Sequence, residues 1–122
     1  MADNVVEELN VKTPGINTPL VKLSGGNQQK VVLGKNIQGD ASVLVMDNVT
    51  RGIDVGAKEE VYRILRQLTD QGLAMVYIGD ELPEIIAMSN RLGVMRDGEL
   101  VEVLDAPVDD KPTESEIIGM MI

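Results

Sequence analysis

The stretch LSGGNQQK, residues 23–30, combines residue types that can hold an anion. Ser24, Gly25 and Gly26 stand in front of a segment that is typical of a helix. The start of a helix offers unpaired backbone N–H groups and the positive end of the helix dipole, and glycines let a phosphate approach the backbone. The same residue types also form flexible loops before amphipathic helices, and for these three residues alone that is the commoner case. The rest of the sequence has to decide between the two.

A second group of candidate residues follows the apolar run SVLVM. Asp47 comes directly after this run, and Asp54 lies in the polar loop beyond it. Open α/β sheets place ligands at the carboxyl ends of their strands, so the Asp47 carboxylate can hold magnesium directly or through water. A lone aspartate after a strand is more often a turn residue. The two stretches together are more specific than either one alone.

The composition excludes several classes of protein. The chain has 122 residues, 43% hydrophobic and 25% charged, which is typical of one globular domain with a modest core. A net charge of -9 and only two aromatic residues argue against nucleic acid as a partner. The absence of histidine and cysteine excludes histidine catalysis, disulfides and thiolate chemistry. We see no leader pattern and no apolar run of membrane length, so we expect a cytoplasmic location.

The segments that must position these residues predict an α/β core. We expect a helix over 27–37 and strands over 42–46 and 73–78, with both strands covered on both faces. Between the strands we expect an amphipathic helix with Asp54 as its N-cap and Gly72 at its end. A strand, a crossover helix and a second strand predict a right-handed parallel unit. Four apolar residues fall on one face of the helix: Val61, Ile64, Leu65 and Leu68.

Further elements follow the second strand. We expect a short helix over 81–89 and a hairpin over 91–104, with Asp97-Gly98 as the two residues of a type I′ turn. Thr113 and Glu116 have capping-box spacing, which predicts a last short helix. The sequence shows no internal repeat and no second domain.

Three segments, LSGGNQQK, VLVMDNVTRGIDVGAKEEVYRIL and ELPEIIAMSNRLGVMRDGEL, resemble an ABC-transporter ATPase, and the resemblance covers about residues 18–104. NQQK and TRGIDVGAK are typical of the second half of the tandem ATPases of ribose-, galactose- and xylose-type sugar importers. The resemblance implies a truncated P-loop NTPase-like α/β domain with a short, mainly parallel sheet, flanking helices and a C-terminal β-hairpin. Residues 1–22 would be an arm left from the helical subdomain, and 23–122 the C-terminal part of the nucleotide-binding domain.

The resemblance also implies a role for the opening stretch. Ser24, Gly25, Gly26, Asn27 and Gln28 would form the signature motif, which contacts the γ-phosphate of ATP bound to the opposite half. A clamp of this kind works in trans and needs no phosphate loop in the same half. We therefore expect a bulky residue at Gly26 to abolish the activity of the reassembled parent while changing the chain's own melting temperature little.

The resemblance also assigns roles to Asp47, to the loop 52–54 and to the switch position. Asp47 would be the Walker B aspartate that holds Mg²⁺, and Gly52, Ile53 and Asp54 would form the loop that crosses between the two halves. Asp80 stands at the switch position after the second strand, where the family has His or Ser. A carboxylate there would repel a γ-phosphate. The alternative is that Asp80 only caps the helix that begins at the next residue.

Departures from the family pattern limit the expected activity. The phosphate-loop pattern GxxxxGKS/T does not occur in the sequence. Asn48 and Val49 stand where the family usually has Glu-Pro, and an amide cannot accept a proton from attacking water as a carboxylate can. The chain therefore looks like a fragment, inactive by itself, in which ATP and Mg²⁺ belong to the parent assembly and neither binds the isolated chain.

The resemblance implies an N-terminal nucleotide-binding half and sugar-permease membrane subunits as partners, at the inner face of the cell membrane. An alternative is a non-catalytic regulatory or interaction module derived from an ABC ATPase. An independent ATPase is disfavoured by the missing phosphate loop and by Asn48. Because the strand that leads into the phosphate loop is missing, at least one sheet edge would be unpaired, and we expect a homodimer.

Overall fold

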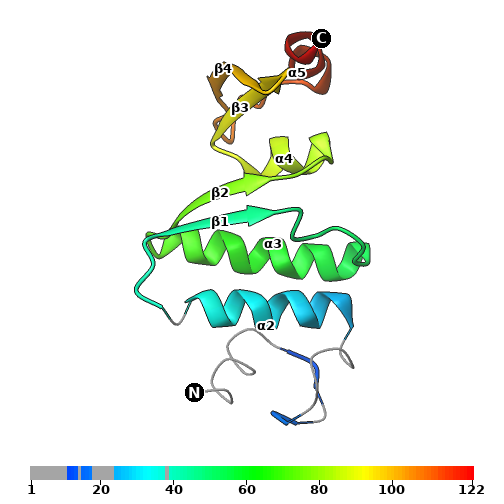
Figure 1. The fold of residues 1–122 in the computed structure, drawn as a ribbon, viewed down its shortest axis with the longest axis vertical. Coiled ribbons are helices and arrows are strands. Elements are labelled where there is room, and N and C mark those ends of the chain that lie inside the picture. Colours follow the sequence, from blue (N-terminus) through cyan, green and yellow to red (C-terminus); the bar gives the residue numbers. More distant parts are fainter. Residues whose placement is uncertain (1–10, 14, 18–23, 38) are drawn as a thin grey trace. The chain divides into compact units, whose positions relative to one another are not determined.

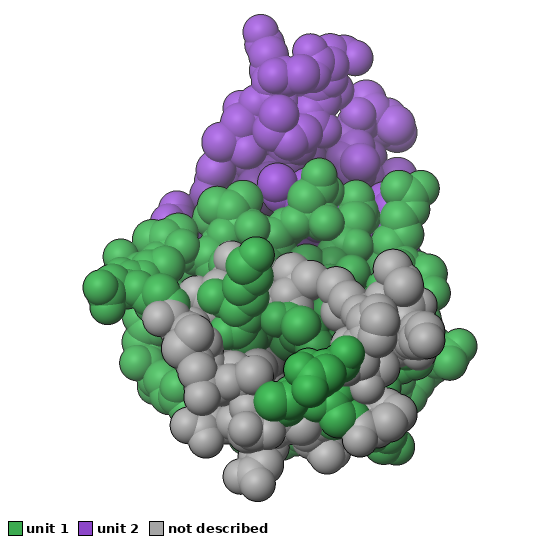
Figure 2. Space-filling view, turned by 60° about the horizontal axis from the view of Figure 1, so that its bottom comes forward, with its two compact units in different colours: residues 1–76 green, residues 77–122 purple. Residues whose placement is uncertain are grey.

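The computed structural model describes residues 11–13, 15–17, 24–37 and 39–122 (Figure 1). These form two compact units, Met1–Val76 and Tyr77–Ile122, which Figure 2 colours separately. No sequence feature indicated this division, and the predicted boundary at 22/23 lies outside the described residues. The elements in chain order are α2 Gly25–Ile37, β1 Val43–Asp47, α3 Val55–Asp70, β2 Ala74–Ile78, α4 Leu82–Met88, β3 Arg91–Arg96, β4 Glu99–Asp105 and α5 Glu114–Met121.

The α/β core predicted from the sequence is confirmed in the first unit. Strands β1 and β2 pair in a two-stranded sheet and run in the same direction (Figure 1). Helix α3 lies along this sheet, and α2 runs beside α3 on the side away from the strands. Asp54 is the N-cap of α3, and Gly72 follows its end with a φ of 99°. The four predicted core residues of α3, Val61, Ile64, Leu65 and Leu68, are all buried.

Within the described residues of the first unit, the two strands keep exposed valines, which corrects the expectation that both faces are covered. Met46 is buried, whereas Val43, Val45 and Val76 keep half or more of their surface exposed. The described helices α2 and α3 both lie on one side of the strands. A continuous apolar run has the same composition whether one face or both faces are covered, so the sequence could not distinguish the two cases.

In the second unit, α4, the β3–β4 hairpin and α5 share a small core. Asp97 and Gly98 have φ values of 51° and 81°, as the predicted type I′ turn requires. Thr113 and Glu116 form the predicted capping box at the start of α5. No helix in the described part of the chain is long and apolar enough to cross a membrane. The buried residues of the core are Ile86, Leu92, Val94, Ala106 and Ile117.

Candidate functional site

Ser24 caps the start of α2, and the helix includes both glycines instead of following them. The Asn27 backbone N–H donates to Ser24 Oγ at 3.3 Å, and the Gln28 N–H donates to the Ser24 carbonyl oxygen at 2.8 Å. The helix therefore begins at Gly25, two residues earlier than predicted. The first-turn N–H groups of Gly25 and Gly26 have no intrahelical acceptor. No acidic residue stands in this first turn.

The side chain of Asn27 orients the Ser24 hydroxyl. Asn27 Nδ2 donates to Ser24 Oγ at 2.8 Å, in addition to the backbone N–H of the same residue. A hydroxyl has two acceptor positions and one proton, so two incoming hydrogen bonds leave Ser24 with its proton to donate elsewhere. Asn27 Oδ1 accepts the backbone N–H of Lys12 at 2.8 Å, which ties the segment 11–13 to the start of α2. Ser24 itself is exposed.

Both signature glycines pack against the loop and helix that follow β1. A Cβ atom on Gly25 would lie 2.9 Å from Ile53 Cγ2, and one on Gly26 would lie 2.6 Å from Ala57 Cβ. Gly26 is buried. The structure therefore brings Gly25 and Gly26 beside Ile53 and Ala57, a contact that the sequence did not predict. It also corrects the expectation that a bulky residue at Gly26 leaves stability unchanged, because a larger side chain would have to push α2 away from α3.

Successive tight turns form the loop between β1 and α3. The Arg51 N–H donates to the Asn48 carbonyl at 3.1 Å, and the Ile53 N–H donates to the Thr50 carbonyl at 3.4 Å. Gly52 has a φ of 75°, a conformation that side chains other than glycine rarely adopt. The Asp54 side chain makes no capping hydrogen bond and is exposed. The Asp54 carboxylate therefore does not cap the backbone N–H groups of α3.

Asp47 and Asn48 form one polar group at the carboxyl end of β1. Asn48 Nδ2 donates to Asp47 Oδ1 at 2.9 Å, and Asn48 has a φ of 49°, which asparagine tolerates better than most residues. Asp47 is exposed. Among the described residues no group of three or more acidic, His or Cys side chains could hold a metal. One carboxylate fits Mg²⁺, which commonly takes one or two carboxylates and completes its shell with water and phosphate.

An ion pair between the buried Lys30 and the partly buried Glu60 links α2 to α3, and no sequence pattern indicated it. Lys30 is only 2% exposed, and its Nζ lies 2.5 Å from Glu60 Oε2. Both residues occupy ordinary helical positions, where a lysine and a glutamate usually face solvent. The sequence feature that could have pointed to Lys30 is its place in the NQQK motif, which is part of the family resemblance.

Asp80 lies in the second unit, so its position relative to Asp47 is not defined. Asp80 is exposed and precedes α4. The N-cap of α4 is Glu81, whose carbonyl accepts the Ile85 N–H at 3.1 Å, and the helix starts at Leu82. The alternative that Asp80 caps this helix is therefore wrong. The helix starts one residue later than expected, which leaves Asp80 outside the cap.

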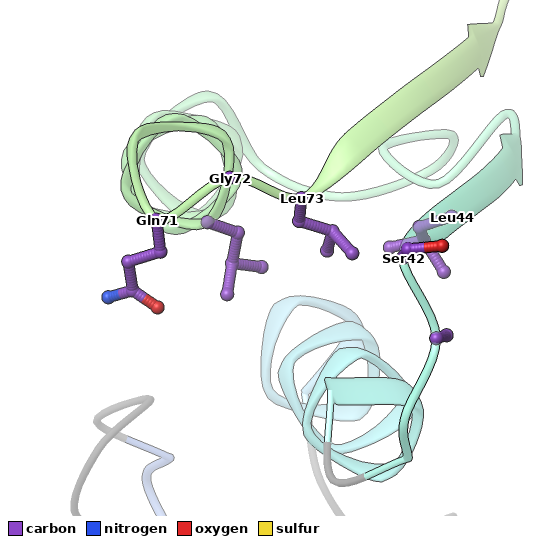
Figure 3. A pocket seen from close by; sticks show the side chains of 7 residues that line it. Ser42, Leu44, Gln71, Gly72 and Leu73 are labelled. Atoms are coloured by element: carbon purple, nitrogen blue, oxygen red, sulfur yellow. The ribbon is translucent and has the colours of Figure 1, made fainter.

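A cavity of about 260 Å³ lies at the other end of the first unit (Figure 3). It is found where β1 and β2 begin and α3 ends, away from the carboxyl end of β1. None of the predicted site residues lines it. The lining residues are Ala41, Ser42, Leu44, Leu68, Gln71, Gly72 and Leu73.

Solved structures show which class this fold belongs to. A nucleotide-free ATP-binding cassette from an ABC transporter matches with a TM-score of 0.82 over 99% of this chain and 48% of that chain, at 19% identity. A dimeric cassette in a post-hydrolysis state, bound to ADP and Pi, matches with a TM-score of 0.71 over 84% of this chain and 44% of that chain, also at 19% identity. The fold is that of the matching part of an ABC ATPase domain. No family model matches the sequence.

Curated relatives are more specific than the fold. The chain is 47% identical over 105 residues to the ribose import ATP-binding protein RbsA of Hahella chejuensis, which covers 86% of this chain and 21% of that protein. It is 40% identical over 121 residues to the arabinose import ATP-binding protein AraG of Chromohalobacter salexigens, covering 99% of this chain and 24% of that protein. The chain is thus a homologue of sugar import ATP-binding proteins, and it spans between 21% and 24% of their length.

Proposed function

We propose that this chain supplies the trans phosphate clamp of a sugar-importing ABC ATPase. In this role Ser24, Gly25 and Gly26, with Asn27 and Gln28, hold the γ-phosphate of ATP that is bound to an opposite nucleotide-binding half. The observation that carries the proposal is the start of α2, where two glycine N–H groups and a donating hydroxyl stand beside the loop 52–54. The names of the relatives supply the substrate class, a sugar.

Several features of the helix start favour a bound phosphate. The hydroxyl of Ser24 and the first-turn N–H groups are hydrogen-bond donors, and the helix dipole adds positive potential. Asp54, in the neighbouring loop, would contact the opposite half or its nucleotide. Asp47 would hold the Mg²⁺ that accompanies ATP, and bound Mg²⁺ would neutralise charge on the phosphates. The Asn48 amide fixes the Asp47 carboxylate through the bond from Nδ2.

The chain by itself is proposed to be unable to hydrolyse ATP. Asn48 occupies the position of the usual glutamate, and its amide has no basic lone pair to accept a proton from water. General-base help is worth about 10² to 10⁴ in rate. The sequence also lacks the pattern GxxxxGKS/T, so the main contacts to the β-phosphate have to come from the opposite half.

The proposed partners are an N-terminal nucleotide-binding half and sugar-permease membrane subunits, with the assembly at the cytoplasmic face of the membrane. The net charge of -9 continues to argue against nucleic acid. A second candidate function is a non-catalytic regulatory or interaction module. It is favoured by the bond between Asn48 and Asp47, because this pair has lost the general base while the fold is kept.

Calorimetric titration separates these functions. The isolated chain should bind Mg-ATP with a Kd weaker than about 100 μM, which corresponds to roughly 5.5 kcal/mol. A tighter Kd would refute the proposed dependence on a second half. The chain should then associate with an opposite half, selected for its GxxxxGKS/T pattern, only when Mg-ATP is present. Association that is independent of ATP would favour the interaction module.

Ser24→Asp tests the clamp without removing the helix cap, because aspartate is as good an N-cap as serine. The added carboxylate should repel the γ-phosphate and abolish the ATP-dependent association. Ser115→Asp is the matched control, since Ser115 is exposed near the start of α5 and gains the same charge. Equal association by the two variants would contradict a phosphate contact at Ser24.

A further inference from the structure

The proposed clamp gives no role to Lys30, although this lysine is the most deeply buried charged residue in the described part of the chain. Its side chain is 3% exposed, and its Nζ lies 2.5 Å from Glu60 Oε2. Burying a lysine costs several kcal/mol in desolvation, and a buried pair often contributes less to stability than apolar residues of similar volume. Such a pair is best known for fixing one register between packed elements.

The contacts between α2 and α3 follow a regular register. Gly25 approaches Ile53, Gly26 approaches Ala57, and Lys30 pairs with Glu60, so positions later in α2 meet positions later in α3. The two helices therefore run in the same direction, and both start at the end where β1 finishes (Figure 1). Any sliding of α2 along α3 would move the start of α2 relative to the loop 52–54.

The glycine contacts and the ion pair constrain different motions. Gly25 and Gly26 have no side chains, so they allow close approach but present little shape that resists sliding. The Lys30 ammonium is almost fully buried and lies 2.5 Å from Glu60 Oε2, so a shift along the helix axis would separate the two charges where little water reaches the ammonium. The glycines fix how close the helices come. The ion pair between Lys30 and Glu60 fixes where along α3 the helix sits.

We propose that Lys30 and Glu60 are positioning residues, which fix the register of α2 on α3 and so hold Ser24–Gly26 at one place beside the loop 52–54. This proposal rests on the proposed function, because it gives the phosphate clamp its fixed geometry. Neither residue touches the nucleotide. They act through the first turn of α2.

Lys30→Met separates positioning from simple stabilisation. Methionine keeps an unbranched chain of similar length and removes the buried charge, so the folded state should survive. The Glu60 carboxylate that loses its partner is still stabilised by solvent, because its side chain is 26% exposed, and by Arg63, whose Nη2 lies 4.0 Å from Glu60 Oε1. A cooperative melt is the check that the variant folds. Arg91→Met is the matched control, since it removes an exposed pair with Asp105 at 3.6 Å.

Amide hydrogen exchange measures, without any partner, how often the first turn of α2 opens when α2 is no longer held at one place on α3. The Gln28 N–H bonds the Ser24 carbonyl at 2.8 Å inside α2, so its exchange rate reports the opening of that turn. In Lys30→Met this amide should exchange about tenfold faster or more, while the Leu65 amide inside α3 keeps its rate. An unchanged rate at Gln28 in the folded variant would overturn the proposal, whether or not the clamp function holds.

Association with the opposite half gives the functional readout. Lys30→Met should weaken ATP-dependent association by about tenfold to a hundredfold, as expected for a binding group displaced by about 1 Å, and Arg91→Met should not. Lys30→Met could show faster exchange at Gln28 and still associate with the opposite half as strongly as wild type. That result would overturn the link between the ion pair and the clamp. If the wild-type chain itself does not associate, the proposed function fails, and the exchange rates alone decide the positioning role.

A charge-swapped variant covers the case in which Lys30→Met does not fold. Lys30→Glu combined with Glu60→Lys restores an ion pair with the charges reversed. The double variant should return the exchange rate of the Gln28 amide to within about threefold of wild type, and either single substitution should not. If the double variant melts cooperatively but its Gln28 amide still exchanges as fast as in the single variants, the proposal is overturned.

Discussion

Replacing Gly26 with alanine tests whether the signature glycines hold the fold together. The new Cβ would lie 2.6 Å from Ala57 Cβ, much closer than two methyl groups can pack. Overpacking of this kind costs about 1–3 kcal/mol, and alanine returns at most about 1 kcal/mol of helix propensity. We expect a net loss of about 1–2 kcal/mol, which lowers the melting temperature of a chain of this size by roughly 4–8 °C.

Moving the methyl group across the interface should restore the loss. In the double variant Gly26→Ala/Ala57→Gly, the Cβ at position 26 faces only the Cα of residue 57, at an ordinary contact distance of 3.8 Å. Its melting temperature should return to within about 2 °C of wild type, and a double-mutant cycle should give a coupling of about 1–3 kcal/mol. Gly56→Ala is the control, because nothing lies within 4 Å of the atom it adds. The reasoning is wrong if Gly26→Ala melts like wild type in circular dichroism.

Asn27→Asp turns a donor into an acceptor and draws the Ser24 proton inward, so association with the opposite half, measured by calorimetry, should weaken about tenfold or more while the melting temperature changes little. The Thr113 backbone N–H, and then its hydroxyl, lower the pKa of Glu116. The stabilisation of α5 should therefore be complete above the unfolded pKa of about 4.3 and be lost as the pH falls through the lower folded pKa, and Glu116→Gln should remove this acid dependence of amide exchange in α5. Among the described residues, the sheet has only the two strands β1 and β2, and Val43, Val45 and Val76 are exposed. These features predict self-association, which light scattering at tens of micromolar should detect as a dimer and which a monomer at all concentrations would contradict.

Most of the fold was predictable because its signals are local. The face of α3, the Asp97-Gly98 turn and the capping box of Thr113 and Glu116 each depend on residues within a few positions of one another. The start of α2 was placed two residues late, since glycine has poor helix propensity and was interpreted as loop. The division into two units has no local signal, because it depends on contacts between distant segments.

The sequence selects candidate site residues but does not predict their contacts. Motif resemblance selected Ser24, Asp47 and Asp54, but nothing in the sequence says that Asn48 donates to Asp47. The pairing of Lys30 with Glu60 was equally hidden, because an ion pair between two helices leaves no periodic pattern. Side-chain pairing between two helices depends on how the helices lie against each other, and no local pattern in the sequence specifies that arrangement.

The packing of Gly26 against Ala57, together with its proposed place in the phosphate clamp, changes how a mutation at this residue has to be interpreted. A side chain at Gly26 would block the approach of a phosphate to the backbone, and it would also push α2 away from α3. Loss of activity in a Gly26 variant therefore does not show that the glycine touches ATP. Activity restored by Ala57→Gly would assign the loss to packing, whereas a stable but inactive double variant would assign it to the phosphate. Ser24→Asp needs no such correction, because it keeps the helix cap while it removes the hydroxyl donor and adds a charge that repels the phosphate.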